Sequence, residues 1–305
     1  MEIRLEKREN MRFEKEYFEK EIRCDFEVSF CMKHAWAAEM EVLQCVAEIC
    51  EKNGLQYYAH WGTLLGAVRH KGFIPWDDDI DIALKREDYN RLIDILPKEL
   101  PDGFIIGGIH SNQQKEKHST DMFHLYVGAN AFLWDLNQYR KVFHDYPFPL
   151  VGIDIFPLDY VPCDLQIFET QKKLIEIGIA IKSNWKELEE KGELERRLLE
   201  FEELSGVTLP EKNTRYHLLC VLDSIMSLYH SGEGQYLNDY MNPNRNLLEE
   251  SWYEDVIKMP FENMEVAVPI GYDRILKCLY GDYHKWVQGK ASHSYPYYKS
   301  MKPLF

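Results

Sequence analysis

Apolar residues recur at helical spacing in several segments of the chain. In residues 34–52 they form one stripe, and Asn53-Gly54 would end that helix; the stripe contains Trp36, Met40, Leu43, Ala47 and Cys50. A second helix is expected over 86–96, closed by Pro97, and another over 272–280, closed by Gly281. These stripes predict helices that pack one face against a core.

Short runs of β-branched and aromatic residues predict strands between these helices. The runs lie at residues 55–60, 80–84, 104–109, 122–127 and 150–156, and a polar loop is expected at 111–120. Helical spacing returns at 164–204 and 214–230, and an extended segment follows at 260–270. The order predicts an α/β (α+β) protein with a mixed-sheet core and a mostly helical C-terminal half. We therefore expect a charged helical segment at 1–33, a core at 34–162 and a helical region at 163–305.

Composition and charge narrow the class of protein. The chain of 305 residues is 45% hydrophobic and 29% charged, which is typical of a globular protein. Its net charge of −15 argues against a nucleic-acid partner, since a phosphate backbone requires a basic surface. It has no apolar run long enough to span a bilayer and no apolar secretory signal, so a cytoplasmic location is expected. The seven cysteines form no C-x-x-C pair, which argues against a zinc site.

The most informative stretch runs from Gly62 to Ile82 and ends in an acidic run. Four aspartates fall within the five positions 77–81. Alternate residues of a strand face the same side, so Asp79 and Asp81 are expected to point together. Neighbouring carboxylates repel unless a cation lies between them, and hard oxygen ligands suit Mg²⁺ or Mn²⁺. The alternative is a solvated acidic turn that leads into an edge strand.

A third carboxylate, Asp154, interrupts the apolar strand 150–156. Its burial without a partner would be costly, so a metal or a charged partner is expected. Two carboxylates on one strand and a third on a neighbouring strand are typical of nucleotidyl- and phosphoryl-transfer sites. We therefore take Asp79, Asp81 and Asp154 as the candidate metal ligands and catalytic residues.

Residues upstream of the aspartates are candidates for binding a phosphate. Gly62 and Thr63 follow a strand, Thr63 is a plausible N-cap for a helix through Arg69, and backbone N–H groups at such a turn can hold a phosphate. Arg69 and Lys71 either bind the phosphate or balance the local aspartates. Trp76 either stacks on a base or serves as a structural anchor.

Three blocks of this sequence resemble the LicD family, which groups phosphocholine transferases with fukutin and fukutin-related protein. The first block is Gly62 to Ile82, and the second is Ile153-Asp154-Ile155-Phe156-Pro157-Leu158-Asp159. The third comprises Phe261-Glu262-Asn263, Val268-Pro269, Tyr272-Asp273 and residues 279–283. The resemblance covers roughly residues 34–283 and implies a nucleotidyltransferase-like fold. It implies metal ligands at Asp79 and Asp81, Asp154 as the third carboxylate, and Gly62 and Thr63 at the donor phosphates.

The resemblance also implies an activity. The expected reaction is Mg²⁺-dependent transfer of phosphocholine, or a similar phospho-alcohol, from a CDP-alcohol donor, with CDP-choline favoured. The expected acceptor is a sugar hydroxyl of a cell-surface glycan or teichoic-acid-type precursor, and a lipid-linked acceptor would require contact with the inner face of the membrane. A nucleotidyltransferase that uses a nucleoside triphosphate is the alternative enzyme. If the protein is not an enzyme, the alternative is a non-catalytic metal- or glycan-binding module.

Overall fold

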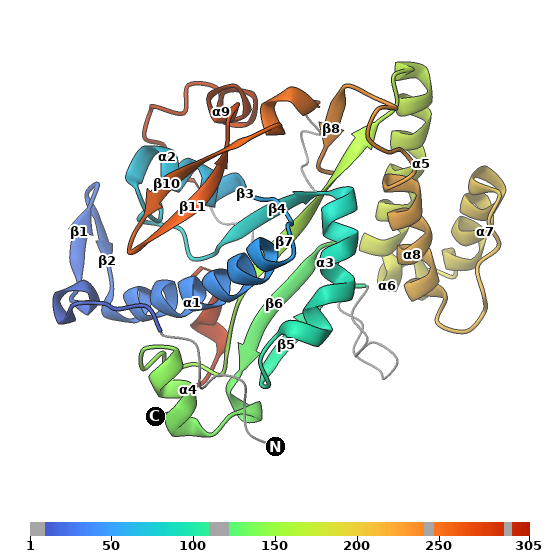
Figure 1. Cartoon of the computed structure of the whole chain (residues 1–305). Helices are drawn as coiled ribbons and strands as arrows, with labels where there is room; N and C mark the ends of the chain where they lie inside the picture. Colours follow the sequence, from blue (N-terminus) through green and yellow to red (C-terminus); the bar gives the residue numbers. More distant parts are fainter. Residues whose placement is uncertain (1–9, 110–121, 241–246, 290–294) are drawn as a thin grey trace. The chain divides into compact units, whose positions relative to one another are not determined.

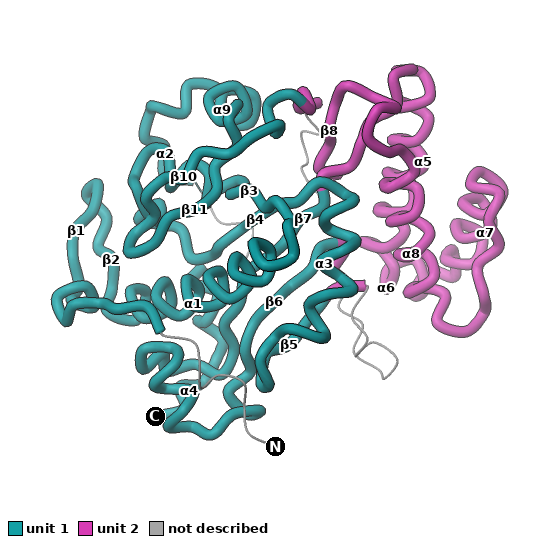
Figure 2. The backbone as a smooth tube through the Cα atoms, in the orientation of Figure 1, with its two compact units in different colours: residues 1–107, 124–157, 251–305 teal, residues 108–123, 158–250 magenta. Residues whose placement is uncertain are grey.

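The computed structural model describes residues 10–109, 122–240, 247–289 and 295–305 (Figure 1). The chain forms two compact units, which Figure 2 colours separately. Unit 1 comprises residues 1–107, 124–157 and 251–305, and unit 2 comprises residues 108–123 and 158–250. This division differs from the predicted regions, because the last part of the chain returns to the unit that holds the predicted core. The predicted polar loop at 111–120 lies outside the described residues.

A mixed sheet forms the centre of unit 1, as the strand pattern predicts. The strand order is β3-β4-β7-β6-β5, with bounds Tyr57–Ala59, Asp81–Lys85, Leu150–Val161, Leu125–Asn130 and Phe104–Gly107. β3 pairs antiparallel with β4, and β6 pairs antiparallel with β5 and with β7. The carbonyl of Ile80, just before β4, accepts a hydrogen bond from the backbone N–H of Asp154 on β7 at 3.0 Å. The predicted acidic segment and the predicted third carboxylate are therefore neighbours in the fold.

Helices α1, α2 and α3 pack against this sheet. They span Phe30–Lys52, Trp61–His70 and Arg86–Glu99. α1 begins earlier than predicted because Ser29 is its N-cap and accepts a hydrogen bond from the N–H of Met32 at 3.2 Å. α1 contacts β6 and α3, while α2 contacts β3 and β4. In α1 the buried set extends beyond the apolar stripe to Lys33, Glu39 and Glu41.

Between and after these strands, unit 1 also contains several short elements, a separate β-hairpin and the helix α9 (Tyr272–Tyr280). The short elements are η4 (Ala131–Leu133), α4 (Leu136–Val142), η5 (Glu250–Tyr253), which begins at the unit boundary, and η6 (Tyr297–Ser300). β10 (Val256–Phe261) and β11 (Met264–Pro269) form the antiparallel hairpin in the segment predicted to be extended. This hairpin contacts β3 and α2, which brings the C-terminal residues back to the core. α9 spans Tyr272–Tyr280 and ends at Gly281, as predicted.

The N-terminal segment differs from the predicted charged helix. It contains a 3₁₀ turn, η2 (Lys15–Phe18), and an antiparallel hairpin of β1 (Glu21–Arg23) and β2 (Phe26–Val28). Cys24 and Asp25 connect the two strands with φ values of 54° and 60°. The hairpin is tied to the core because Arg23 Nη2 donates to Glu262 at 2.9 Å. These contacts join residues far apart in the sequence, so helical periodicity could not reveal them.

Two prolines do not end their elements where the sequence suggested. Pro97 lies inside the last turn of α3, which continues to Glu99. Pro157 lies inside β7, which was expected to end at Phe156. The pairing of β7 with β6 stops at Ile155, and its pairing with β8 (Tyr236–Asn238) starts at Asp159. Pro157 therefore occupies a gap between two hydrogen-bonded ladders, where its missing N–H is tolerated.

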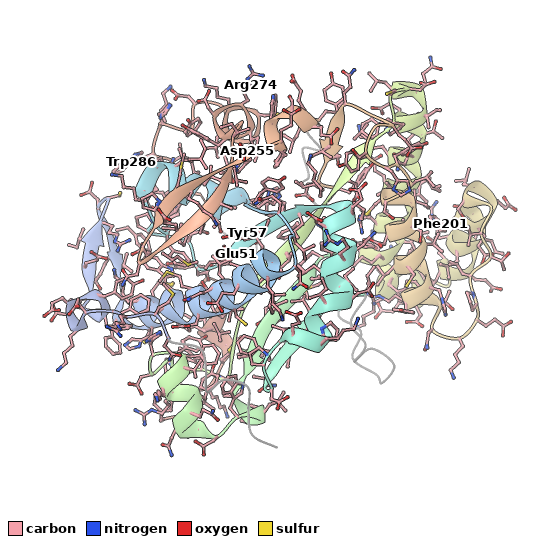
Figure 3. The ribbon with its side chains drawn as sticks, in the orientation of Figure 1. Glu51, Tyr57, Phe201, Asp255, Arg274 and Trp286 are labelled. Atoms are coloured by element: carbon pink, nitrogen blue, oxygen red, sulfur yellow. The ribbon has the colours of Figure 1, made fainter. Side chains whose placement is uncertain are left out.

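Unit 2 is mostly helical, as predicted for this part of the chain. Its helices are α5 (Leu165–Ser183), α6 (Trp185–Glu190), α7 (Leu194–Ser205) and α8 (Thr214–Met226). Two short strands, β8 (Tyr236–Asn238) and β9 (Leu248–Glu249), pair with each other. The core of unit 2 includes Phe201, labelled in Figure 3, together with Ile175, Leu218 and Leu222, all of which are fully buried. No helix in the described ranges has the length and apolar content needed to cross a membrane.

Candidate active site

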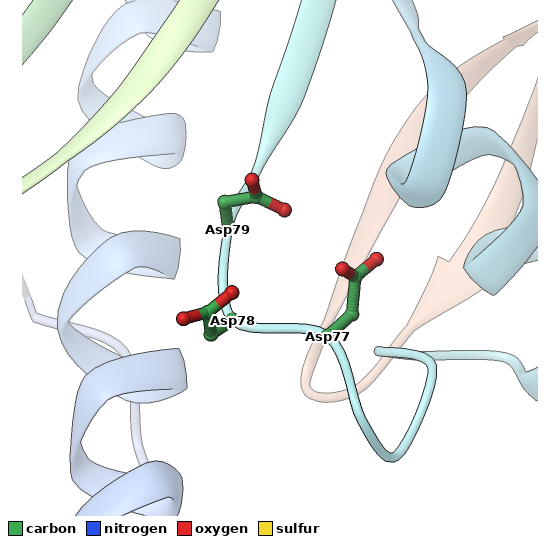
Figure 4. Close-up of side chains that lie close together, drawn as sticks. All are labelled: Asp77, Asp78 and Asp79. Carbon is green, nitrogen blue, oxygen red and sulfur yellow. The ribbon is translucent and has the colours of Figure 1, made fainter. Parts of the chain in front are cut away.

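Three consecutive aspartates form a compact acidic cluster in unit 1, just before β4. Asp77, Asp78 and Asp79 each offer a carboxylate oxygen, and these oxygens lie within 4.8 Å of one another (Figure 4). The strand begins only at Asp81, so Asp77 to Asp79 lie in a loop and do not follow strict strand alternation. This corrects the prediction that Asp79 is a strand residue. We call Asp77, Asp78 and Asp79 the acidic loop.

Charge is concentrated in the acidic loop. Burial raises the pKa of the Asp77 carboxyl, and the nearby charges of Asp79 and Asp78 raise it further. The Asp79 side chain is close enough to that of Asp77 to contribute to the same increase in pKa. Two ionised carboxylates this close together repel each other. A cation placed between them would relieve that repulsion.

Asp78 is held differently from its neighbours. It is fully buried, and its Oδ2 accepts a hydrogen bond from the backbone N–H of Tyr297 at 2.5 Å. In Figure 4 the Asp78 carboxylate lies on the side of the acidic loop that faces α1. The carboxylates of Asp77 and Asp79 lie on the opposite side of the loop. The hydroxyl of Tyr297 is 2.9 Å from that of Tyr146, which donates to the carbonyl of Leu150. Asp78 therefore anchors the acidic loop to the C-terminal segment of the chain.

Glu39 adds a fourth carboxyl from α1. Glu39 is 1% exposed, and its Oε2 has no hydrogen-bond partner among the described residues. Burial raises the pKa of Glu39 well above its usual range, and the charges of Asp79 and Asp78 raise it further. A hydrogen bond with Tyr297 acts in the opposite direction. Glu39 is thus a buried carboxyl whose charged form is disfavoured beside the acidic loop.

The predicted residues Asp81 and Asp154 flank the acidic loop without belonging to its group of close oxygens. Asp81 is 6% exposed, and its backbone N–H donates to Thr63 Oγ1 at 2.8 Å. The sequence predicted Thr63 as the N-cap of α2. This prediction is wrong, because His60 is the N-cap and Thr63 lies in the first turn of the helix. Asp154 is held beside Ile80 by the backbone hydrogen bond between them.

Tyr280 of α9 lies near the aspartates of the loop and of β4. Burial of its hydroxyl raises the pKa of Tyr280, and the charges of Asp77, Asp81 and Asp79 contribute to the shift. The residue as a whole nevertheless remains 44% exposed. An aromatic ring that borders both solvent and the carboxylates is suited to contact a substrate there. The sequence pattern did not single out Tyr280, although it lies in the third block of family resemblance.

Gly62 lies in the first turn of α2, directly against the acidic loop. A Cβ at this position would lie 2.3 Å from Oδ2 of Asp77. Only glycine leaves room for the carboxylate where it stands. The same turn of α2 presents the N-terminal N–H groups of a ten-residue helix, which favour an anion. Gly62 and Thr63 are therefore placed at a helix N-terminus beside the acidic residues.

The other residues predicted to contact the donor have structural partners. Arg69 Nη1 donates to the carbonyls of Tyr283 and Lys285 at 2.8 and 3.2 Å. Lys71 is exposed, follows α2 in the left-handed region and accepts a hydrogen bond at its carbonyl from the N–H of Glu262. Trp76 is half-buried, and its ring lies 6.1 Å from that of Phe26. All three residues therefore contact other parts of unit 1.

The donor set of the acidic loop fits a hard divalent cation. Its ligand atoms are all carboxylate oxygens, which Mg²⁺ and Mn²⁺ prefer. Their mutual repulsion, expressed in the raised pKa of Asp77, would be relieved by a bound cation. Asp77 and Asp79 carry this argument, because Asp78 is engaged by Tyr297.

Comparison with known proteins identifies the class of this domain. Residues 54–164, which hold strands β3 to β7 and the acidic loop, match the family model described as LicD/FKTN/FKRP, nucleotidyltransferase domain.

Individual relatives extend the match. The chain is 26% identical over 250 residues to the lipopolysaccharide cholinephosphotransferase LicD of Haemophilus influenzae. The matched stretch covers 81% of this chain and 88% of that protein. It is 32% identical over 118 residues to an uncharacterized protein of Rickettsia prowazekii, covering 39% of this chain and 44% of the relative. It is 42% identical over 48 residues to the human ribitol 5-phosphate transferase FKRP, covering 16% of this chain and 10% of that protein.

Proposed function

We propose that this protein is a metal-dependent transferase that moves a phospho-alcohol from a CDP-activated donor to a sugar hydroxyl of a cell-surface glycan or teichoic-acid-type precursor. Phosphocholine is the favoured group, because a relative that matches 81% of this chain is named a lipopolysaccharide cholinephosphotransferase. The named activity of FKRP, ribitol 5-phosphate transfer, supports the broader class of phospho-alcohols. The observation that carries the proposal is the acidic loop inside a domain of this family.

The chain's own residues supply the parts that such a reaction needs. Asp77 and Asp79 would hold Mg²⁺ or Mn²⁺, with Asp81 and Asp154 beside them. The bound ion would neutralise charge on the phosphates of the donor. The first turn of α2, with Gly62 and Thr63, would bind a donor phosphate through backbone N–H groups.

The proposed transfer balances without another reactant. The acceptor hydroxyl forms a bond to the phosphorus nearer the alcohol, the bond from that phosphorus to CMP breaks, and a carboxylate of the site takes the hydroxyl proton. CMP leaves as the second product. The protein therefore has to bind the donor, orient the acceptor hydroxyl and neutralise the phosphate charge. It forms no covalent intermediate in this scheme.

The released product tests the proposal. The purified full chain is incubated with Mg²⁺ and CDP-choline, CDP-ethanolamine, CDP-ribitol or CDP-glycerol, with a phosphate-bearing glycan precursor or water as acceptor, and nucleotides are separated by chromatography. Release of CMP that stops with EDTA and in Asp79→Asn supports the proposal. Release of pyrophosphate from a nucleoside triphosphate would favour nucleotidyl transfer instead. Metal binding with no product from any donor would favour a non-catalytic binding module.

A further inference from the structure

His124 lies immediately before β6 in unit 1, where its imidazole contacts Asp154 and Phe156. Nε2 of His124 is 3.2 Å from Oδ1 of Asp154. The ring stacks on Phe156, with centroids 4.5 Å apart and planes 30° from parallel. The His124 side chain is 13% exposed, whereas that of Asp154 is 32% exposed. The imidazole is therefore fixed on two sides, beside a carboxylate that reaches solvent.

The hydrogen-bonding environment defines what His124 can do. Nδ1 is buried and has no hydrogen-bond partner among the described residues. A hydrogen on Nδ1 would have no acceptor there, whereas a hydrogen on Nε2 can be donated to Asp154. We therefore assign the Nε2–H tautomer, in which His124 donates to Asp154. The enclosed Nδ1 is not placed to accept a proton from a substrate, so His124 acts through Asp154.

Asp154 connects His124 to the acidic site. Its backbone N–H donates to the carbonyl of Ile80, which lies between Asp79 and Asp81 in the chain. On its other side Asp154 is paired in register with Tyr126 of β6. The Tyr126 ring lies across β7, since a Cβ added at Gly152 would be 2.3 Å from its Cζ. The backbone of Asp154 is thus fixed by hydrogen bonding and pairing on both sides, and Oδ1 of its carboxylate is in contact with Nε2 of His124.

We propose that His124 is a positioning residue of the metal site. It would hold Oδ1 of Asp154 and so keep that carboxylate in one orientation beside the acidic loop, where Asp154 would help Asp77 and Asp79 to hold the divalent cation. The inference rests on the metal site of the proposed function, and it is independent of which donor is used. Outer hydrogen bonds that orient a ligand carboxylate typically change metal affinity or activity by about 10–100-fold when they are removed.

Two variants separate the hydrogen bond from the ring stack. His124→Phe keeps an aromatic ring against Phe156 but removes the donor. His124→Gln removes the ring and keeps an amide N–H near the position of Nε2. Mn²⁺ binding, followed by electron paramagnetic resonance of the free ion, is the readout, because it requires no substrate. We expect His124→Phe to weaken Mn²⁺ binding about 10–100-fold, and His124→Gln to retain most of the affinity. His230→Phe, at an exposed position, is the matched control and should bind as the unmodified protein does.

The outcomes separate this inference from the proposed function. Wild-type Mn²⁺ affinity in a folded His124→Phe protein, or equal losses in both variants, would overturn the role of His124. If His124→Phe does not fold, the test passes to His124→Ala, made alone and in an Asp154→Asn protein. Alone, His124→Ala should weaken Mn²⁺ binding; in the Asp154→Asn background it should have no further effect, and an additional loss there would contradict the inference. Mn²⁺ binding without CMP release would reject the proposed transfer alone, while no Mn²⁺ binding by the unmodified protein would reject both.

Discussion

Replacing Gly62 with alanine tests whether the position of Asp77 matters for function. The added Cβ would lie 2.3 Å from Oδ2 and 3.3 Å from Cγ of Asp77, whereas ordinary contact begins near 3.4 Å. The carboxylate oxygen must therefore move by about 1 Å. A displacement of that size in a catalytic site can lower turnover by about 10²-fold. We expect a loss of that order in CMP release and a weaker affinity for Mn²⁺.

The same substitution should leave the fold intact. The atom that must move is the end of a side chain, and alanine is favoured over glycine inside a helix by about 1 kcal/mol. We therefore expect the melting temperature of Gly62→Ala, measured in EDTA, to equal or exceed that of the unmodified protein. Gly289→Ala is the matched control, because a Cβ there meets no atom within 4 Å. Normal turnover and Mn²⁺ affinity in a folded Gly62→Ala protein would refute the reasoning.

Three further substitutions distinguish roles within the acidic site. Asp79→Asn should reduce turnover by orders of magnitude with an unchanged melting temperature, and near-normal turnover would exclude Asp79 as a ligand. Asp78→Ala should lower the free energy of unfolding by about 1–3 kcal/mol in urea titrations, because it leaves the partly buried N–H of Tyr297 without this acceptor, and Asp78→Asn should lose less; equal losses would contradict the anchor role. Glu39→Gln should stabilise the protein in EDTA, and its advantage should grow as the pH rises above the usual pKa of a glutamate. The raised pKa of Glu39 means that the folded state binds its proton more tightly than the unfolded state does, so stability is lost as the pH rises; an advantage that shrank with pH would contradict this.

Local patterns in the sequence were sufficient to predict much of the fold. α9 has the predicted bounds because its apolar stripe and Gly281 are both local signals. The end of α1 at Asn53 follows from the same kind of signal. The predicted N-cap of α2, Thr63, was wrong. Its side-chain oxygen accepts a hydrogen bond from the N–H of Asp81, a partner 18 positions further along the chain. A capping preference cannot anticipate such a partner.

The candidate site was only partly visible in the sequence for the same reason. The acidic run was evident, but adjacency in a loop does not reveal which carboxylates converge. Asp78 is distinguished from Asp77 and Asp79 by Tyr297, which lies 219 positions away. The contact of His124 with Asp154 depends on how the start of β6 meets β7, and a single sequence does not fix that register.

Calorimetric titration with cytidine nucleotides tests the central claim most directly. The purified chain and Asp79→Asn are each titrated with CDP-choline, CDP-ribitol and CTP, in Mg²⁺ and in EDTA. We predict that a CDP-alcohol binds the unmodified chain in Mg²⁺, that EDTA abolishes the binding, and that Asp79→Asn does not bind it. Binding of CTP with no response to any CDP-alcohol, or CDP-alcohol binding that is unchanged by EDTA and by Asp79→Asn, would contradict the account.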